Sequence, residues 1–106
     1  MAAQLHHVAI NAEHFEEVVR FFTEVFQMEV SRTDGENPAR RLWFRQGIQV
    51  NEASAAKRCA GLCDHIGIQV TDKAEVLEKA AAFGCTPVPG KPHWFTTPEG
   101  IVIELM

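Results

Sequence analysis

The chain has 106 residues, of which 46% are hydrophobic, and a formal net charge of -4 at pH 7. These values are typical of one globular domain with a small core, and we expect a single domain over residues 1–106. The acidic balance argues against a nucleic-acid partner. No apolar run approaches the roughly 18 residues of a membrane span, and no signal peptide is present, so we expect a cytoplasmic protein without a membrane partner. The three cysteines form no disulfide framework and are predicted to be reduced.

The first half of the chain predicts one strand, one helix and three further strands. Residues 5–11 alternate, with His7, Ala9 and Asn11 on one face. Apolar residues then recur at helical spacing over residues 15–26. They are Phe15, Val18, Val19, Phe22, Val25 and Phe26. Strands are expected at 28–32, 40–45 and 47–51, with a turn at 34–38 and a linker at 52–62.

The second half repeats this order. Residues 64–70 predict a strand that carries His65 and Gly67 on one face. Asp72 is a suitable N-cap for a helix over residues 73–83, and Gly84 is a suitable end. The expected inner face of this helix consists of Val76, Leu77, Ala80 and Phe83. Strands at 85–88, 94–96 and 101–106, with a turn at 98–100, complete the second of two βαβββ modules, at about 1–53 and 62–106.

The two modules align by position. His7 precedes His65 by 58 residues, and Gln49 precedes Glu104 by 55, so nearly one offset superposes both pairs. The two histidines open their modules, and the two oxygen donors lie between apolar neighbours on the closing strands. Four polar side chains therefore converge if the open faces of the modules pack together.

These patterns resemble the vicinal oxygen chelate superfamily, which includes glyoxalase I, methylmalonyl-CoA epimerase, extradiol dioxygenases and bleomycin-resistance proteins. The matching stretches are Leu5–Ile10, Phe21–Phe22, Val25–Met28, Asp64–Ile68, Phe95–Gly100 and Ile103–Leu105. The resemblance implies an α+β fold, in which one glyoxalase-like domain forms a cupped mixed or antiparallel sheet around a divalent metal. Gln27 departs from this pattern, because the family usually has glycine after the first helix.

The metal ligands that the resemblance implies are His7, Gln49, His65 and Glu104. Glutamine at the second of these positions is most similar to methylmalonyl-CoA epimerase, whereas relatives of glyoxalase I usually have glutamate there. Imidazole, carboxylate and amide donors suit Zn, Ni, Co, Mn or Fe(II), and the sequence does not select one of them. Each histidine taken alone is more often a hydrogen-bonded structural residue than a ligand.

A metal at this position predicts lyase or isomerase chemistry on a small carbonyl or carboxylate substrate. The ion would stabilise an enediolate or enolate after proton loss beside a carbonyl, and Glu104 is the predicted catalytic base. The predicted substrate-binding residues are Trp43, Arg45, His93 and Trp94, and each also fits a plain packing or surface role. If Arg45 faces the cup, its guanidinium is suited to a substrate carboxylate.

Two other functions remain open at this point. One is a non-catalytic, drug-sequestering binding protein, and the other is an Fe(II)-dependent extradiol-type dioxygenase, which needs only two histidines and one glutamate. Modules of this family pair within one chain or across a dimer. We expect a homodimer that buries the sheet edges, and the sequence leaves open whether His7 and His65 of one chain share a metal.

Overall fold

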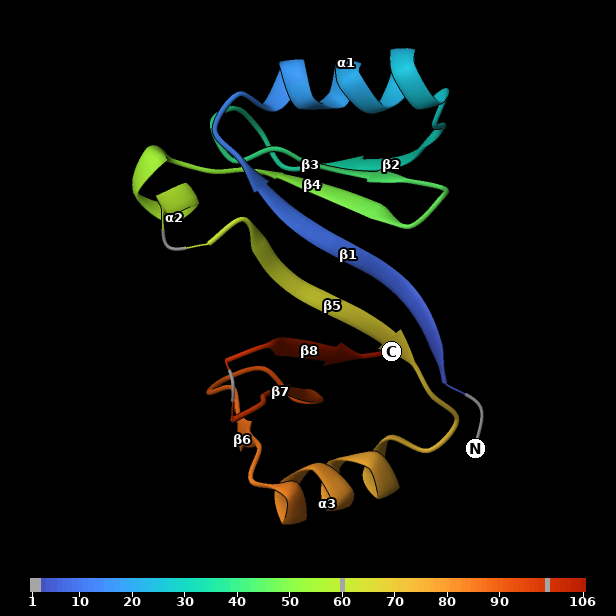
Figure 1. Ribbon diagram of the computed structural model, residues 1–106, viewed down its shortest axis with the longest axis vertical. Helices are drawn as coiled ribbons and strands as arrows, with labels where there is room; N and C mark the ends of the chain where they lie inside the picture. Colours follow the sequence, from blue (N-terminus) through green and yellow to red (C-terminus); the bar gives the residue numbers. More distant parts are fainter. Residues whose placement is uncertain (1–2, 60, 99) are drawn as a thin grey trace. The chain divides into compact units, whose positions relative to one another are not determined.

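The computed structural model describes residues 3–59, 61–98 and 100–106 (Figure 1). Glu99 of the predicted turn and the Cys59 side chain lie outside this description, while Cys63 and Cys85 are free thiols. The chain divides into two compact units. The N-terminal unit is His7–Asp64, and the C-terminal unit joins the residues up to His6 to His65–Met106.

The N-terminal unit contains a mixed sheet in the order β2-β3-β4-β1. Strand β1 spans Gln4–Ala12, and its Val8–Ala12 part pairs in parallel with β4, Ile48–Glu52. Strands β2, Val30–Asp34, and β3, Arg41–Phe44, add to β4 in antiparallel fashion. Strand β2 begins two residues later than predicted, and the other strands agree with the sequence within one or two residues.

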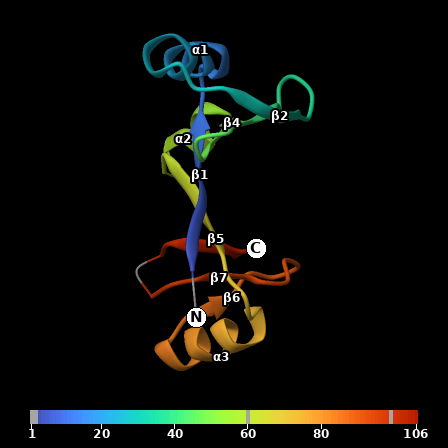
Figure 2. The ribbon, with the colours of Figure 1, turned by 90° about the vertical axis from the view of Figure 1, so that its right-hand side faces the viewer.

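Helix α1, Phe15–Phe26, has the predicted bounds and lies over one face of this sheet (Figures 1 and 2). The buried core beneath it consists of Ala12, Phe15, Leu42, Phe44 and Val50. Val18, Val19 and Phe22 pack against this core as predicted. Val25 and Phe26 are exposed instead, so the predicted apolar stripe contacts the core only through its first two turns.

The C-terminal unit repeats the arrangement with strands in the order β5-β8-β7-β6. Strand β5, Cys63–Gln69, pairs in parallel with β8, Val102–Leu105. Strand β7, Trp94–Thr96, joins β8 to the short strand β6, Thr86–Pro87, through antiparallel pairs. Pro87 and Pro89 limit β6 to two residues, because proline donates no backbone hydrogen bond.

Helix α3, Lys73–Phe83, has the predicted bounds and caps. The Asp72 carboxylate accepts a hydrogen bond from the Glu75 backbone N–H at 3.1 Å, and Gly84 ends the helix in the left-handed conformation. The core of this unit consists of Phe95, Ile103 and Leu105 with the partly buried Ile66, Ile68, Val70, Val76, Leu77, Ala80 and Cys85. Phe83, predicted to face this core, is 82% exposed.

The predicted linker contains a short helix, α2, Ala55–Cys59. Ser54 caps it by accepting a hydrogen bond from the Lys57 N–H at 3.2 Å. Alanine is the best helix former and serine is a preferred N-cap, so the local sequence favours this turn of helix. The described part of the chain has no helix that is long and apolar enough to cross a membrane.

Candidate functional site

The N-terminal unit carries a row of buried polar side chains on the sheet face opposite its core. Strand alternation places His7, Ala9 and Asn11 on this face of β1, as the sequence predicts. Ala9 pairs with Gln49 on β4, and Asn11 pairs with Asn51. His7, Asn11, Gln49 and Asn51 are all at least nine-tenths buried. The two predicted ligands of this unit therefore share one polar face.

Gln49 is held at both ends of its amide. The Trp43 indole Nε1–H donates a hydrogen bond to Gln49 Oε1 at 2.8 Å, and Gln49 Nε2 donates to Asn51 Oδ1 at 2.8 Å. These bonds fix which end of the amide is the oxygen. Because a carbonyl oxygen has two lone pairs, Gln49 Oε1 keeps one for a further interaction.

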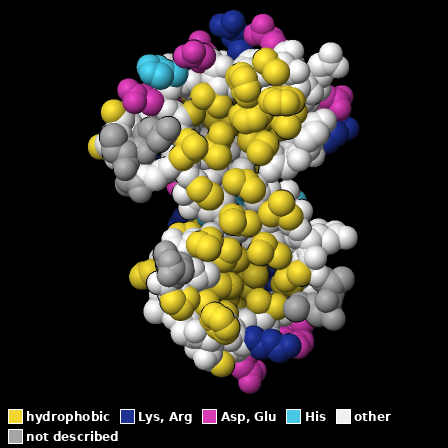
Figure 3. Space-filling model, viewed as in Figure 1, with side chains coloured by type: hydrophobic (Ala, Val, Ile, Leu, Met, Phe, Trp, Pro, Cys, Tyr) yellow, Lys and Arg dark blue, Asp and Glu magenta, His cyan; other side chains and the backbone are white. Residues whose placement is uncertain are grey.

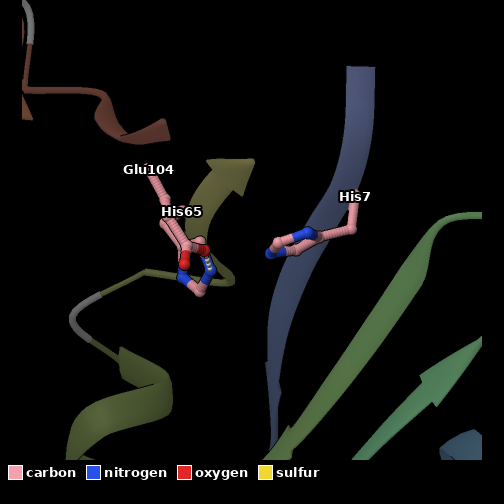
Figure 4. Close-up of side chains that lie close together, drawn as sticks. All are labelled: His7, His65 and Glu104. Atoms are coloured by element: carbon pink, nitrogen blue, oxygen red, sulfur yellow. Dashed lines mark ion pairs between the residues drawn. The ribbon is translucent and has the colours of Figure 1, made fainter. Parts of the chain in front are cut away.

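The C-terminal unit brings His65 and Glu104 together. His65 Nε2 lies 3.2 Å from Glu104 Oε1, and the His65 side chain is 6% exposed (Figure 4). Glu104 pairs across the strands with Gly67, which follows His65 by two residues and therefore lies on the same strand face. An imidazole and a carboxylate at this separation are compatible with proton exchange or with a shared cation.

Trp94 completes this cluster. Its ring centroid lies 4.6 Å from that of His65, and its backbone pairs with Glu104 on β8. Trp94 occupies the same place in its unit as Trp43, which pairs with Gln49 on β4. Both tryptophans were predicted from the sequence to bind substrate. Their equivalence in the repeat was not predicted, because they are 51 residues apart whereas the aligned pairs are 58 and 55 residues apart.

Strand register agrees with the predicted alignment of the two modules. Ala9 pairs with Gln49 in one parallel ladder, and Gly67 pairs with Glu104 in the other. Each small residue follows its histidine by two positions and therefore lies on the same strand face. The structural repeat thus places Gln49 and Glu104 at equivalent positions.

Two predicted substrate-binding residues lie apart from these contacts. Arg45 follows β3, is exposed, and has its guanidinium 4.0 Å from Glu29. His93 is also exposed and precedes β7 with φ of 70°. In the described chain its imidazole makes no hydrogen bond or ion pair, while its carbonyl accepts a bond from the Leu105 N–H. The substrate-binding role of both residues remains a prediction.

Sequence reasoning placed Asn11 on the polar face without giving it a role, and it missed Asn51 and Arg32. Asn51 continues the hydrogen-bond chain from Gln49, and the alternation of β4 is the signal that would have identified it. The Arg32 guanidinium carbon lies 4.3 Å from the centre of the Trp43 ring. A register irregularity between Val30 and Arg32 interrupts the alternation of β2, so the sequence did not reveal the face of Arg32.

A second group of charges surrounds Arg40 in the N-terminal unit. Its guanidinium donates to Glu52 at 2.9 and 2.8 Å and to Glu16 at 3.0 Å. The hydrogen bonds that Arg40 donates to Glu52 lower the pKa of Glu52, and together with the bond that Glu16 accepts they raise the pKa of Arg40. These residues line an open hollow beside α1 that includes none of the predicted site residues. We interpret this group as ion pairs that stabilise the packing of α1 against β4.

This chain is similar to known proteins in structure but not in sequence. No family model matches the sequence, and no curated protein sequence does. A hypothetical protein from Bacillus halodurans is similar in structure, with a TM-score of 0.71, 16% identity, and coverage of 99% of this chain and 94% of that one. Streptomyces coelicolor methylmalonyl-CoA epimerase, solved with 2-nitronate-propionyl-CoA, has a TM-score of 0.71 and 17% identity, with coverage of 96% of this chain and 94% of that one.

A third similar structure is the 2,3-dioxygenase LapB of Pseudomonas, with a TM-score of 0.70 and 18% identity over 96% of this chain and 41% of that one. Identities this low establish shared architecture. The chain has the glyoxalase-like α+β fold, so the fold implied by the sequence resemblance to the vicinal oxygen chelate superfamily is confirmed.

The donor set of the C-terminal unit fits a divalent metal. His65 offers a neutral imidazole nitrogen and Glu104 a carboxylate oxygen, and both are accepted by Zn and by the later first-row ions. The Trp94 ring lies against the buried His65 side chain. A metal at this place therefore has a preformed pair of ligands within one unit.

Proposed function

We propose that this chain is a metal-dependent enzyme of lyase or isomerase type, which moves a proton beside a carbonyl of a small carbonyl or carboxylate compound. The observation that carries the proposal is the His65–Glu104 pair, 3.2 Å apart and largely buried. The proposal includes membership of the vicinal oxygen chelate superfamily. The epimerase among the similar structures supports an enzyme of this fold class.

The proposed ligands are His7, His65 and Glu104, as the sequence resemblance implies, and they offer two imidazoles and one carboxylate. His7 is 5% exposed and occupies in its unit the place that His65 occupies in the other. Gln49 is the proposed fourth ligand, through the lone pair of Oε1 that Trp43 does not use. The hydrogen bond from Trp43 orients this oxygen, as outer partners of metal ligands generally do.

A divalent metal bound by these residues supplies Lewis-acid stabilisation of negative charge that develops on a substrate oxygen. Glu104 is the proposed base that accepts and returns the substrate proton, and its position against His65 holds the carboxylate in place. Trp94 pairs with Glu104 across β7 and β8 and packs against His65, so it lies beside this proposed base.

Metal content tests the ligand assignment. Protein purified without a histidine tag is loaded with Zn, Ni, Mn or Fe(II) and measured by elemental analysis. We expect about one metal per site in the wild type and its loss in His65→Ala and His7→Ala, because each substitution removes a ligand. His14→Ala is the matched control, since His14 is exposed before α1, and it should keep the metal.

Glu104→Gln tests the chemical role on the same preparations. We expect it to abolish turnover and the exchange of substrate protons with D₂O, because an amide cannot act as the base. Full turnover with metal bound would refute the role of Glu104. Absence of metal from the wild type under every loading condition would favour the non-catalytic binding protein.

A second candidate is Fe(II)-dependent dioxygenation. It needs only two histidines and one glutamate, which is the ligand set of non-haem iron oxygenases, and it leaves Gln49 hydrogen-bonded to Trp43 and Asn51 without a metal contact. The similarity to a 2,3-dioxygenase points the same way. Oxygen consumption by the Fe(II)-loaded protein on catechols would support this candidate, whereas Zn-supported proton exchange would support the first.

A further inference from the structure

The Trp43 ring makes cation–π contacts with two arginines, Arg32 and Arg41. The Arg32 guanidinium carbon lies 4.3 Å from the ring centre, and that of Arg41 lies 5.8 Å away. Arg32 pairs with Trp43 between β2 and β3, so both side chains lie on the face that carries Gln49. The polar row of the N-terminal unit therefore ends in two cations.

Arg32 is the less satisfied of these cations. Arg41 donates a hydrogen bond to Asp34 at 2.8 Å, whereas the Arg32–Asp34 separation is 3.7 Å, too long for a hydrogen bond. In the described part of the chain the Arg32 guanidinium makes no hydrogen bond. Stacking on an aromatic ring uses the flat face of a guanidinium and leaves its N–H edges available. Two arginines against one aspartate also leave one positive charge uncompensated.

Strand spacing gives the distance of this charge from the proposed ligand His7. Strands β1, β4, β3 and β2 are consecutive neighbours in the sheet. Neighbouring strands lie about 4.8 Å apart, so Trp43 is roughly 10 Å and Arg32 roughly 14 Å from the strand of His7. A compound of several atoms spans this distance, whereas a three-carbon compound does not.

We propose that Arg32, held over the Trp43 ring, is a specificity-determining residue that binds an oxyanion of the substrate, either a carboxylate or a phosphate. The substrate class is then an extended acidic compound whose oxyanion lies roughly 10–14 Å from its reacting carbonyl, which is the span from the His7 strand to Trp43 and Arg32. Arginine suits this role because its fork of N–H donors matches both oxyanions. The inference rests on the proposed function, because it names the substrate class of that site.

The C-terminal unit has a similar arrangement, which supports the assignment. Lys91 Nζ lies 4.3 Å from the centre of the Trp94 ring, and Trp94 contacts His65. Each tryptophan that neighbours a proposed ligand thus holds a cation. Lysine is a compact, strongly hydrated charge, so the planar Arg32 remains the stronger candidate for directed oxyanion binding.

Indole NMR signals test the proposal directly. The chain has two tryptophans, so two indole N–H signals are expected, and Trp43→Phe identifies one of them. Glutarate, inorganic phosphate and the neutral glutaramide are titrated at constant ionic strength. We expect glutarate or phosphate to shift the Trp43 signal with saturation and glutaramide to leave it unchanged. If only glutarate shifts the Trp43 signal with saturation, the bound oxyanion is a carboxylate. If only phosphate does so, it is a phosphate.

Arg32→Gln should weaken this binding at least about tenfold, because it removes charge-assisted hydrogen bonds. Arg32→Lys keeps the charge but loses the fork and should give an intermediate value. Arg20→Gln removes an exposed charge from α1 and should bind as the wild type does. Equal binding by wild type and Arg32→Gln, or equal response to glutaramide, would overturn the proposal.

Metal loading separates this inference from the proposed function. The same titrations are made on metal-free and Zn-loaded protein, with metal content measured on each sample. Oxyanion binding in a protein that takes up no metal would refute the proposed enzyme while leaving Arg32 as a binding residue. Metal uptake without any response of the Trp43 signal would refute the role of Arg32 and leave the proposed enzyme intact.

Discussion

Each unit has one tryptophan beside a proposed ligand. Trp43 donates a hydrogen bond to Gln49, whereas Trp94 packs its ring on His65. In both cases a rigid aromatic side chain restricts a polar one, so that the donor atom has a defined position before any ligand arrives. We therefore expect substitution of either tryptophan to alter the geometry of the site as well as its walls.

The ion pair between Arg40 and Glu52 gives a prediction at the residue scale. Hydrogen bonds from Arg40 lower the pKa of Glu52 in the folded protein, so protonation of Glu52 favours the unfolded chain. The stabilisation is fully present above the unfolded carboxyl pKa of about 4.3 and is lost as pH falls through the lower folded value. Glu52→Gln should therefore be less stable than wild type at pH 7, with a difference that shrinks toward pH 3.

Urea unfolding of both proteins between pH 3 and 7 measures this difference. Glu24→Gln serves as the control, because it removes a carboxylate from the exposed pair with Arg20. Exposed pairs contribute little, so this control should show a smaller difference at every pH. A wild-type advantage over Glu52→Gln that stays constant down to pH 3 would contradict the prediction.

The two main helices end in the same backbone conformation with different residues. Gly84 follows α3 at φ of 101°, while Gln27 follows α1 at φ of 53°. Glycine enters the left-handed region without steric cost, whereas a residue with a Cβ atom is strained there. The departure from the family pattern at Gln27 therefore has a physical consequence at the end of α1.

Gln27→Gly should raise the free energy of unfolding by roughly 0.5–1 kcal/mol, because it removes the steric strain at the helix end. Thermal or urea unfolding measures the change. Gln27→Ala keeps the Cβ atom and should stay within about 0.5 kcal/mol of the wild type. A loss of stability in the glycine variant would show that Gln27 makes a compensating contribution.

At the scale of the whole molecule, both units leave apolar surface and strand edges uncovered. Strand β2 is an edge of the sheet in the N-terminal unit and β6 is an edge of the sheet in the C-terminal unit, and all five residues of β2 are exposed. Hydrophobic side chains gather on the visible face of each unit (Figure 3). The exposed large apolar residues include Phe21, Val25, Phe26 and Phe83. Open edges and apolar patches of this kind favour association with another chain.

We therefore predict a homodimer, with a mass in solution of twice 11.8 kDa. Light scattering over a range of concentrations, with and without Zn, measures this mass. A monomeric mass at every concentration would contradict the prediction. A dimer that forms only with metal would indicate that the proposed site takes ligands from two chains.

Most elements follow from local sequence. The bounds of α1 and α3 were predicted because apolar spacing, the Asp72 cap and Gly84 all act within a few residues. Alternation also placed His7 and Gln49 on strand faces, and the register of the two parallel ladders agrees with the predicted repeat. Helix α2 was missed because a single turn leaves no periodic signal.

The sequence by itself determined the strand and helix order, the repeat, and the residue types able to bind a metal. Only the tertiary structure decided which side chains meet: Trp43 with Gln49, Trp94 with His65, and Arg32 with Trp43. It also decided that Val25 and Phe83 are exposed. The physical reason is that periodicity fixes the face of a residue, whereas contact and burial depend on strand register and on the elements that pack above it.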